Sequence, residues 1–333
     1  MFKESADGSV VILNNLTGIL DGSDASGPET LVDAPARVTS RSVKIATLIA
    51  VLFPPIALVV AMVLAWGGMF TMVDLVLLVV MYVITGLGVT VGYHRLYTHK
   101  SFEARGPVAW ILAICGSMAV QGPIVWWSAT HRKHHQHSDE ELDPHSPHAG
   151  REPGFTGFVK SFSHAHIGWL FAEERADTER YVPDLLADRV TMAIDRLFPL
   201  WVALGLLLPA AVGGLVTMSW TGALLGFLWG GLVRVCLLHH VTWSVNSVCH
   251  IWGRRDYRSG DESRNNPVMG ILALGEGWHN NHHAFPASAR HGLKWWQFDA
   301  SWVLIRSLQL VGLVSKVRLP AKDRLEARRR VDA

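Results

Sequence analysis

The sequence His131-Arg132-Lys133-His134-His135 places three imidazoles at positions i, i+3 and i+4 of a helix. Residues with this spacing share one helical face, so the three rings can converge on one metal ion. The same pattern recurs at His279-Asn280-Asn281-His282-His283, and a looser pair, His94 and His99, lies upstream. One such box can arise by chance in a chain with 17 histidines, but three boxes beside apolar segments indicate a metal centre.

The composition is that of a membrane protein. Half of the 333 residues are hydrophobic and only 17% are charged, and the mean hydropathy of +0.23 is unusually high for a soluble domain. A formal net charge of +2 is too small to indicate a nucleic-acid partner. Cys115, Cys236 and Cys249 lack CxxC spacing and lie in or beside apolar stretches, so we expect free thiols.

Four membrane-spanning helices are predicted, because a helix needs about 20 apolar residues to cross a hydrocarbon layer of roughly 30 Å. Their expected ranges are about 45–70, 73–93, 197–218 and 220–241. Residues 1–43 are expected to form a disordered tail, residues 44–315 one membrane domain, and residues 316–333 a basic C-terminal tail. The predicted fold class is all-α, with four transmembrane helices and a cytoplasmic helical cap that holds the histidines.

The apolar segment 107–125 could be taken for an additional crossing. If it crossed, His94 and His99 would lie on the opposite side of the membrane from His131, and these boxes could not share a site. We therefore expect a short helix along the membrane surface. Lys and Arg flank the spans on the side of the boxes, whereas the loops near 67–72 and 217–221 carry none. By the positive-inside rule, the boxes and both termini are cytoplasmic.

Eight histidines in three boxes exceed the four ligands of a structural zinc site, so two metals are expected. Imidazole binds iron, copper, nickel and zinc, and the ligands alone do not select among them. A metal centre at a membrane surface, above helices able to shelter an acyl chain, points to chemistry on lipid. An unactivated methylene has no acidic proton for a side-chain base, and an oxygen-activated metal is the usual solution, which favours iron over zinc.

The order HxxxxH, HxxHH, HxxHH resembles the integral-membrane fatty acyl desaturases of the stearoyl-CoA desaturase type, including those of bacteria. Asp143-Pro144-His145 and the Gly275-Glu276-Gly277-Trp278 that precedes the last box add to the resemblance, which covers about residues 45–315. It implies a non-haem site of two iron ions, O2 as co-substrate, and a cis double bond placed between C9 and C10 of a saturated long-chain acyl substrate. A bacterial inner membrane is the expected location.

The resemblance also implies a ninth histidine ligand, His250, and a residue that reaches a metal through water, Asn246. The implied metal-site residues are His94, His99, His131, His134, His135, Asn246, His250, His279, His282 and His283. Nine imidazoles for two metals give four or five each, which leaves room for oxygen on six-coordinate iron. The candidate carboxylates that orient these rings are Asp139, Glu140, Asp143 and Glu276, and solvated charge is the competing interpretation for the first two. The other histidines are interpreted as surface residues or as neighbours of ligands.

By the same resemblance, six residues would line the acyl tunnel, and they are Tyr82, Gly86, Gln121, Trp127, Thr242 and Trp243. Tyr82 would close its far end, and Gly86, one helical turn nearer to the histidines, would leave room for a long chain. Core packing is the competing interpretation for all six.

The acyl carrier stays open between coenzyme A, acyl carrier protein and a membrane lipid. Animal enzymes of this family hold coenzyme A with cations at two places that read Ala129-Thr130 and Glu173-Glu174 here. The sequence contains no attached haem, flavin or CxxC-rich module. We expect a separate electron donor of the ferredoxin, rubredoxin or cytochrome b5 kind, with its reductase.

Two other functions use the same residues. A membrane di-iron hydroxylase of alkanes or acyl chains shares the histidines but places oxygen on carbon, and the repeated HxxHH after Gly-Glu-Gly-Trp favours desaturation. A histidine-rich metal transporter needs polar groups along its path through the membrane. Asp74, near the end of a span, is the only acidic residue in the predicted spans, so transport is the weaker alternative.

Overall fold

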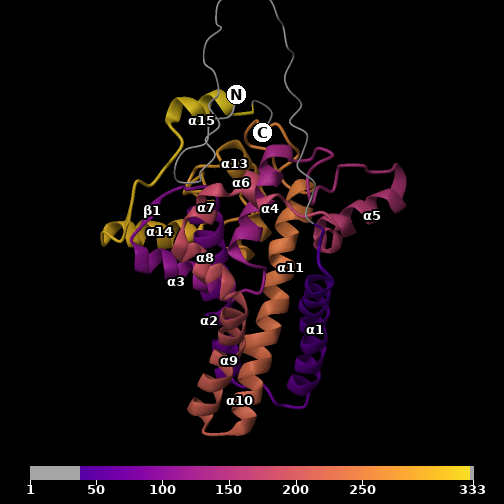
Figure 1. Cartoon of the computed structure of the whole chain (residues 1–333), viewed down its shortest axis with the longest axis vertical. Coiled ribbons are helices and arrows are strands. Elements are labelled where there is room, and N and C mark those ends of the chain that lie inside the picture. The colour runs from indigo at the N-terminus through magenta and orange to yellow at the C-terminus, as the bar shows by residue number, and fades with distance from the viewer. Residues whose placement is uncertain (1–37, 331–333) are drawn as a thin grey trace, which may run out of the picture. The chain divides into compact units, whose positions relative to one another are not determined.

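The computed structural model describes residues 38–330. Residues 1–37 of the tail predicted at 1–43 therefore lie outside the described residues. Four helical stretches are long and apolar enough to cross a membrane, and they lie alongside one another (Figure 1). They are α1 (Arg41–Trp66), α2 with the π-helix η1 (Met72–Leu87, Gly88–Thr98), α9 (Phe198–Thr217), and the succession α10, η3, α11, η4 (Trp220–Gly226, Phe227–Val233, Arg234–Ser247, Val248–His250). The predicted all-α fold with four candidate membrane helices is confirmed.

The remaining elements form a cap at one end of these helices (Figure 1). They are β1 (Glu103–Ala104), α3 (Gly106–Ser117), α4 (Ile124–His137), α5 (Gly154–His166), η2 (Gly168–Phe171), α6 (Thr178–Tyr181), α7 (Pro183–Ala187), α8 (Arg189–Arg196), α12 (Pro267–Leu272), α13 (His279–Ala284), α14 (Ala300–Leu310), β2 (Val314–Ser315) and α15 (Lys322–Arg328). The two short strands pair antiparallel, with Glu103 opposite Ser315. The segment after β2 also belongs to the cap, because the Arg258 N–H donates to the Arg328 carbonyl at 2.8 Å.

The second and fourth spans continue beyond their predicted ends at residues 93 and 241, to Thr98 and His250. Hydropathy marks the end of an apolar stretch, but a helix continues wherever its polar residues are buried by neighbouring protein. His94 and His250 are both buried in this way. Each long helix therefore carries a histidine directly into the cap.

The apolar segment after the first box forms a helix too short to span a membrane. α3 has 12 residues, which at about 1.5 Å per residue is roughly 18 Å, too short for a hydrocarbon layer of about 30 Å. The chain then turns at Val120 and Gly122, which have φ values of 62° and 97°, and α4 begins at Ile124. The first two histidine boxes therefore lie at the same end of the spans.

α3 lies unusually close to η1, the helix that carries His94. A Cβ atom on Gly88 would stand 2.2 Å from the backbone nitrogen of Gly116, and one on Gly116 would stand 2.6 Å from the Tyr93 ring. The Tyr93 hydroxyl also bonds to the Ser117 Oγ at 2.8 Å. Glycine is needed at both positions because any side chain there would separate the two helices.

Arg234 connects the fourth span to its neighbours. Its side chain is fully buried and donates to the carbonyls of Met118 and Gly205 at 2.8 Å each, and to that of Gly230 at 3.2 Å. These carbonyls belong to the end of α3, to α9 and to η3. A buried guanidinium is tolerated when its donors are satisfied in this way, so Arg234 faces protein and not the membrane interface.

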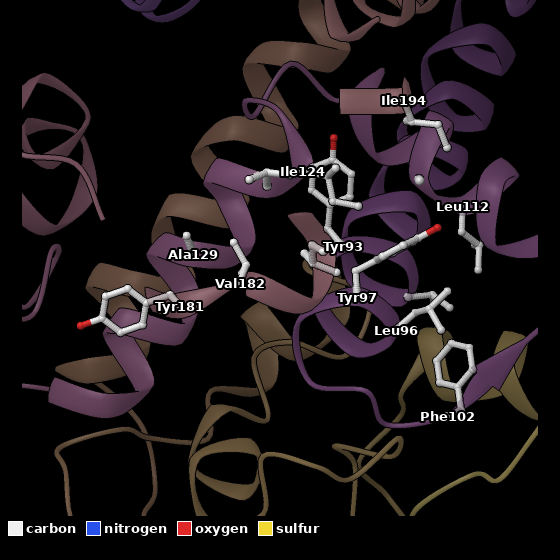
Figure 2. Packing of buried hydrophobic residues seen from close by; sticks show 14 of the residues in the cluster. Tyr93, Leu96, Tyr97, Phe102, Leu112, Ile124, Ala129, Tyr181, Val182 and Ile194 are labelled. Carbon is white, nitrogen blue, oxygen red and sulfur yellow. The ribbon is translucent and has the colours of Figure 1, made fainter. Parts of the chain in front are cut away.

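The main hydrophobic core of the cap lies where η1, α3, α4 and α8 meet (Figure 2). Its labelled members are Tyr93, Leu96, Tyr97, Phe102, Leu112, Ile124, Ala129, Tyr181, Val182 and Ile194. This core holds the helix of the first histidine box against the helix of the second.

We predict that Gly88→Ala destabilises the protein, because the new methyl group would meet the backbone of Gly116, which cannot move aside as a side chain can. Overpacking of this kind costs about 1–3 kcal/mol. Gly231→Ala is the matched control, since a Cβ there would be 3.4 Å from its nearest neighbour. The thermal unfolding midpoint in detergent, followed by tryptophan fluorescence, should fall for the first variant only. Equal midpoints would show that α3 does not depend on this contact.

Candidate metal centre

The nine histidines expected to bind metal converge at the base of the cap. Two clusters are formed, each with its ring nitrogens within 4.8 Å of one another. The five-histidine cluster contains His94, His99, His131, His135 and His282, and the four-histidine cluster contains His134, His250, His279 and His283. The rings come from η1 and the residue after it, α4, η4 and α13. Segments far apart in the sequence therefore supply one compact donor set.

Each HxxHH box divides between the two clusters, which corrects the prediction that three imidazoles of one box converge on one metal. His131 and His135 enter the five-histidine cluster, whereas His134 enters the four-histidine cluster. Consecutive helical residues point about 100° apart, so His134 and His135 cannot aim at the same point. The third box divides in the same manner, and each box bridges both clusters.

The first box depends on the π-helical winding of η1. In an α-helix, residues five apart point in different directions, but a π-helix closes its turn with an i to i+5 hydrogen bond. The His99 N–H donates to the His94 carbonyl at 3.0 Å, which is such a bond. The two rings consequently lie 4.8 Å apart, centroid to centroid.

Buried carboxylates contact the Nδ1 atoms of four rings. Hydrogen bonds join His134 to Asp143 at 2.9 Å, His250 to Asp139 at 2.9 Å and His283 to Asp261 at 2.5 Å. The His94 Nδ1 lies 2.7 Å from Glu276 as an ion-pair contact. A carboxylate accepts the Nδ1–H of a neutral ring, and this leaves the lone pair on Nε2. The three hydrogen-bonded rings are thus oriented with Nε2 free to bind metal.

The Nε2 atoms then face one another. Those of His134 and His283 lie 3.3 Å apart, although both rings use Nδ1–H for their carboxylates. Two lone pairs at this distance repel unless a cation lies between them. The donor set of the two clusters therefore fits metal ions.

A proton is a poor substitute for that cation. Burial lowers the pKa of His283 to about 4, although Asp261 acts to raise it. In the five-histidine cluster, burial, and after it the neighbouring histidines, lower the pKa of His131, His135 and His282 well below the usual range. These four rings are therefore neutral at physiological pH. Neutral imidazole is the form that binds metal.

The carboxylates remain ionised. Burial acts to raise the pKa of Asp143, but His134 and a backbone N–H outweigh it and hold the pKa well below its usual range. Burial is likewise outweighed at Glu276, whose pKa is lowered by His94, His291 and Arg95. Arg95 is fully buried and also pairs with Asp299 at 3.0 Å, so Arg95 compensates part of this negative charge.

Comparison with known proteins agrees with this geometry. The sequence model of the family described as "Fatty acid desaturase" matches residues 72–311, which include all nine histidines. The chain belongs to the fatty acid desaturase family.

Three curated relatives cover most of this desaturase chain. Hex-5-enoyl-[acyl-carrier protein] acetylenase of Moorena producens (strain JHB) is 41% identical over 277 residues, 83% of this chain and 86% of the relative. The sn-1 stearoyl-lipid 9-desaturase of Anabaena variabilis is 40% identical over 250 residues, 74% of this chain and 84% of the relative. Delta-9 acyl-lipid desaturase 1 of Arabidopsis thaliana is 37% identical over 258 residues, 76% and 78% of the two chains.

A narrow cavity adjoins both histidine clusters of the desaturase chain. Its lining residues are Gly86, Val89, Thr90, His94, Trp127, His131, Leu238, Thr242, Val245, Asn246, Ala273, Leu274, Glu276 and His279. Three of the six expected tunnel residues, Gly86, Trp127 and Thr242, are among them, and Gln121 donates to the Thr242 hydroxyl at 2.9 Å. Asn246 shares this cavity with His279 of the four-histidine cluster.

Two expected tunnel residues lie elsewhere. Trp243 is absent from the cavity lining, and its ring packs on His239 and His240 at 4.9 and 5.2 Å, because it follows Thr242 and points about 100° away on the same helix. Tyr82 donates its hydroxyl to the Leu272 carbonyl at 2.7 Å.

Leu274 lies close to Gly86 in the wall of this cavity. A Cβ on this glycine would stand 2.8 Å from a methyl group of Leu274. Leu274 lies just before the third box, and nothing in the sequence pairs it with Gly86. The room that Gly86 is expected to leave for a long chain therefore also depends on the position of Leu274.

Sequence reasoning missed Asp261 and placed Glu140 too near the site. Asp261 lies in a loop without a recognisable pattern, yet it contacts His283. Glu140 is 72% exposed at its side chain and lies 3.7 Å from His137, outside both clusters. His291, interpreted as a surface residue or a neighbour of ligands, is a buried neighbour whose Nδ1 lies 3.0 Å from Glu276.

We predict that Asp261→Ala weakens metal binding about 10- to 100-fold, the usual effect of removing the group that orients a metal-binding histidine. His283 would lose the acceptor for its Nδ1–H. Metal per chain, measured by mass spectrometry after dialysis against graded chelator, should fall. Glu140→Ala is the control and should retain the wild-type metal content. Equal metal content in both variants would contradict this role of Asp261.

Proposed function

We propose that the chain is an oxygen-dependent 9-desaturase that places a cis double bond between C9 and C10 of a saturated long-chain acyl group. The proposal rests on one observation: two clusters, of five and of four histidines, lie beside an apolar cavity in a chain of the desaturase family. Two irons are the proposed metals, one for each cluster, and Asn246 is the proposed link through water to the metal of the four-histidine cluster.

The irons, when bound, would supply the oxidising power of O2 that an unactivated methylene requires. In the overall reaction, the CH2–CH2 unit loses two hydrogens, and two further electrons and two protons complete the reduction of O2 to two water molecules. The two further electrons come from a separate donor protein.

The residues of the chain perform the remaining tasks. Leu238, Val245 and Leu274 give the cavity apolar walls that favour an acyl chain over water. The bond between Gln121 and Thr242 fixes one polar position along these walls. The carboxylates orient the imidazoles while the chain is bound.

A lipid-linked acyl chain is the proposed substrate. The places where animal relatives bind coenzyme A hold Ala129 and Thr130, and an exposed Glu173 that pairs with Lys44 at 3.5 Å. Carboxylates there repel a phosphate-rich head group. The Anabaena and Arabidopsis relatives are named for lipid-linked substrates, which favours the same choice.

Transport of metal receives no support from the spans. Asp74 forms a capping box with Thr71, whose N–H and hydroxyl donate to it at 2.9 and 2.7 Å. Its carboxylate is thus used to begin a helix.

Expression in a host that lacks unsaturated fatty acids is expected to yield cis-9 monoenes from palmitate or stearate, measured by gas chromatography with location of the double bond by mass spectrometry. His134→Ala should abolish the product, whereas His164→Ala, at an exposed histidine outside both clusters, should not. Hydroxy acids alone would indicate a hydroxylase. Acetylenic products, or a bond at another carbon, would overturn the proposed position.

The cap and both termini are proposed to face the cytoplasm of a bacterial inner membrane. In a background without Cys115, Cys236 and Cys249, cysteine at Glu103 or Glu140 should react with a membrane-impermeant thiol reagent only after the cells are opened. Cysteine at Met69, at the other end of the spans, should react in intact cells. Labelling of the first two positions from opposite sides would contradict a shared metal centre.

A further inference from the structure

A second cavity, of about 770 Å³, opens on the surface of the cap. One wall is the loop 284–288, which follows the third histidine box directly, and the other is the segment 317–328, which contains α15. Apolar groups such as Phe285 and Leu319 lie in it beside Arg318, Arg324 and Arg328.

The charge around this cavity is strongly positive. Residues 316–330 include seven Lys or Arg and two Asp or Glu, although the whole chain has a formal net charge of only +2. Arg318 and Arg324 are exposed. Neither has a carboxylate within ion-pair distance among residues 38–330, whereas Lys316 nearby is paired with Glu103 at 2.9 Å. These two guanidinium groups are available to an acidic partner.

The wall formed by residues 284–288 lies close to the metal centre along the chain. Ala284 and Phe285 of this wall are the two residues after His283 of the four-histidine cluster. Arg328 donates to the Ala284 carbonyl and lies over the Phe285 ring at 5.8 Å. An electron that arrives at this wall has a path of one or two residues to a metal-site histidine.

The position of the cavity disfavours two other anionic occupants. α15 lies at the end of the cap opposite the membrane helices (Figure 1), so a lipid surface does not reach it. The cavity also shares no lining residue with the cavity beside the histidines that we assign to the acyl chain. A carrier that inserts an acyl chain would have to dock elsewhere.

We propose that this basic cavity is the docking site of an acidic one-electron carrier protein, which supplies the reducing electrons of the proposed desaturation. The inference rests on the proposed function for its purpose, but the docking itself does not depend on turnover. Each encounter oxidises the carrier by one electron. Two encounters supply the two electrons that, together with two protons and the two hydrogens of the substrate, reduce O2 to two water molecules.

The test measures binding of oxidised carriers to the full-length protein in detergent at low ionic strength. Three acidic probes, a plant-type [2Fe–2S] ferredoxin, a rubredoxin and a soluble cytochrome b5 domain, are compared with the basic cytochrome c. We expect at least one acidic probe to bind, with an affinity that falls as salt is added, and cytochrome c not to bind. Binding of none of the acidic probes would overturn the proposal.

The double variant Arg318→Glu/Arg324→Glu should weaken binding of that probe by about tenfold or more, because charges at the rim of an interface govern encounter and salt dependence. Arg189→Glu, at an exposed arginine of α8, is the matched control and should bind as the wild type does. Unchanged binding by the double variant would place the donor elsewhere. Loss of binding to acyl carrier protein, with the donor unaffected, would assign the cavity to that protein instead.

Turnover separates this inference from the proposed function. With the same reduced carrier, the double variant should show a raised KM for the carrier and an unchanged KM for the acyl substrate, with kcat retained at saturation. If the wild type binds the carrier but forms no unsaturated product, the proposed function fails and the docking site stands. If the wild type turns over and the double variant is unaffected, the docking site fails alone.

Discussion

The hydrogen bond between a buried carboxylate and the Nδ1–H of a histidine is the contact on which the centre depends. A neutral imidazole offers a metal only the nitrogen that carries no proton. Asp139, Asp143 and Asp261 leave Nε2 as that nitrogen in three rings, and Glu276 lies beside the Nδ1 of a fourth, His94. Without these carboxylates, the rings could rotate or change tautomer, and their Nε2 atoms would no longer point toward one another.

The arrangement of the helices brings these histidines and carboxylates together. The second and fourth spans continue into the cap, where their polar ends are buried, and the π winding of η1 turns His94 and His99 to one side. Gly88 allows α3 to lie against that helix, and Arg234 fastens the end of α3 to two other spans. A wrongly placed α3 would displace α4 and, with it, the second histidine box.

The two cavities give the proposed reaction two separate entrances. The cavity beside the histidines has apolar walls and lies next to the spans, as an acyl chain requires. The basic cavity lies between the loop that follows the third box and the segment that contains α15. α15 lies at the end of the cap away from the membrane helices (Figure 1). Because the two cavities share no lining residue, the proposed substrate and the proposed electron donor can be bound together.

The sequence by itself determined the four apolar spans, the three histidine boxes and the need for segment 107–125 to stay on one side, because composition and spacing along one helix are local properties. Resemblance to a family added His250 and Asn246. Only the tertiary structure decided how each box divides between the clusters, that Asp261 serves His283, that Leu274 lies close to Gly86, and that Trp243 faces away from the cavity. These features depend on the winding of a helix, or on which distant residue stands opposite, and neither is expressed in the spacing of residues along the chain.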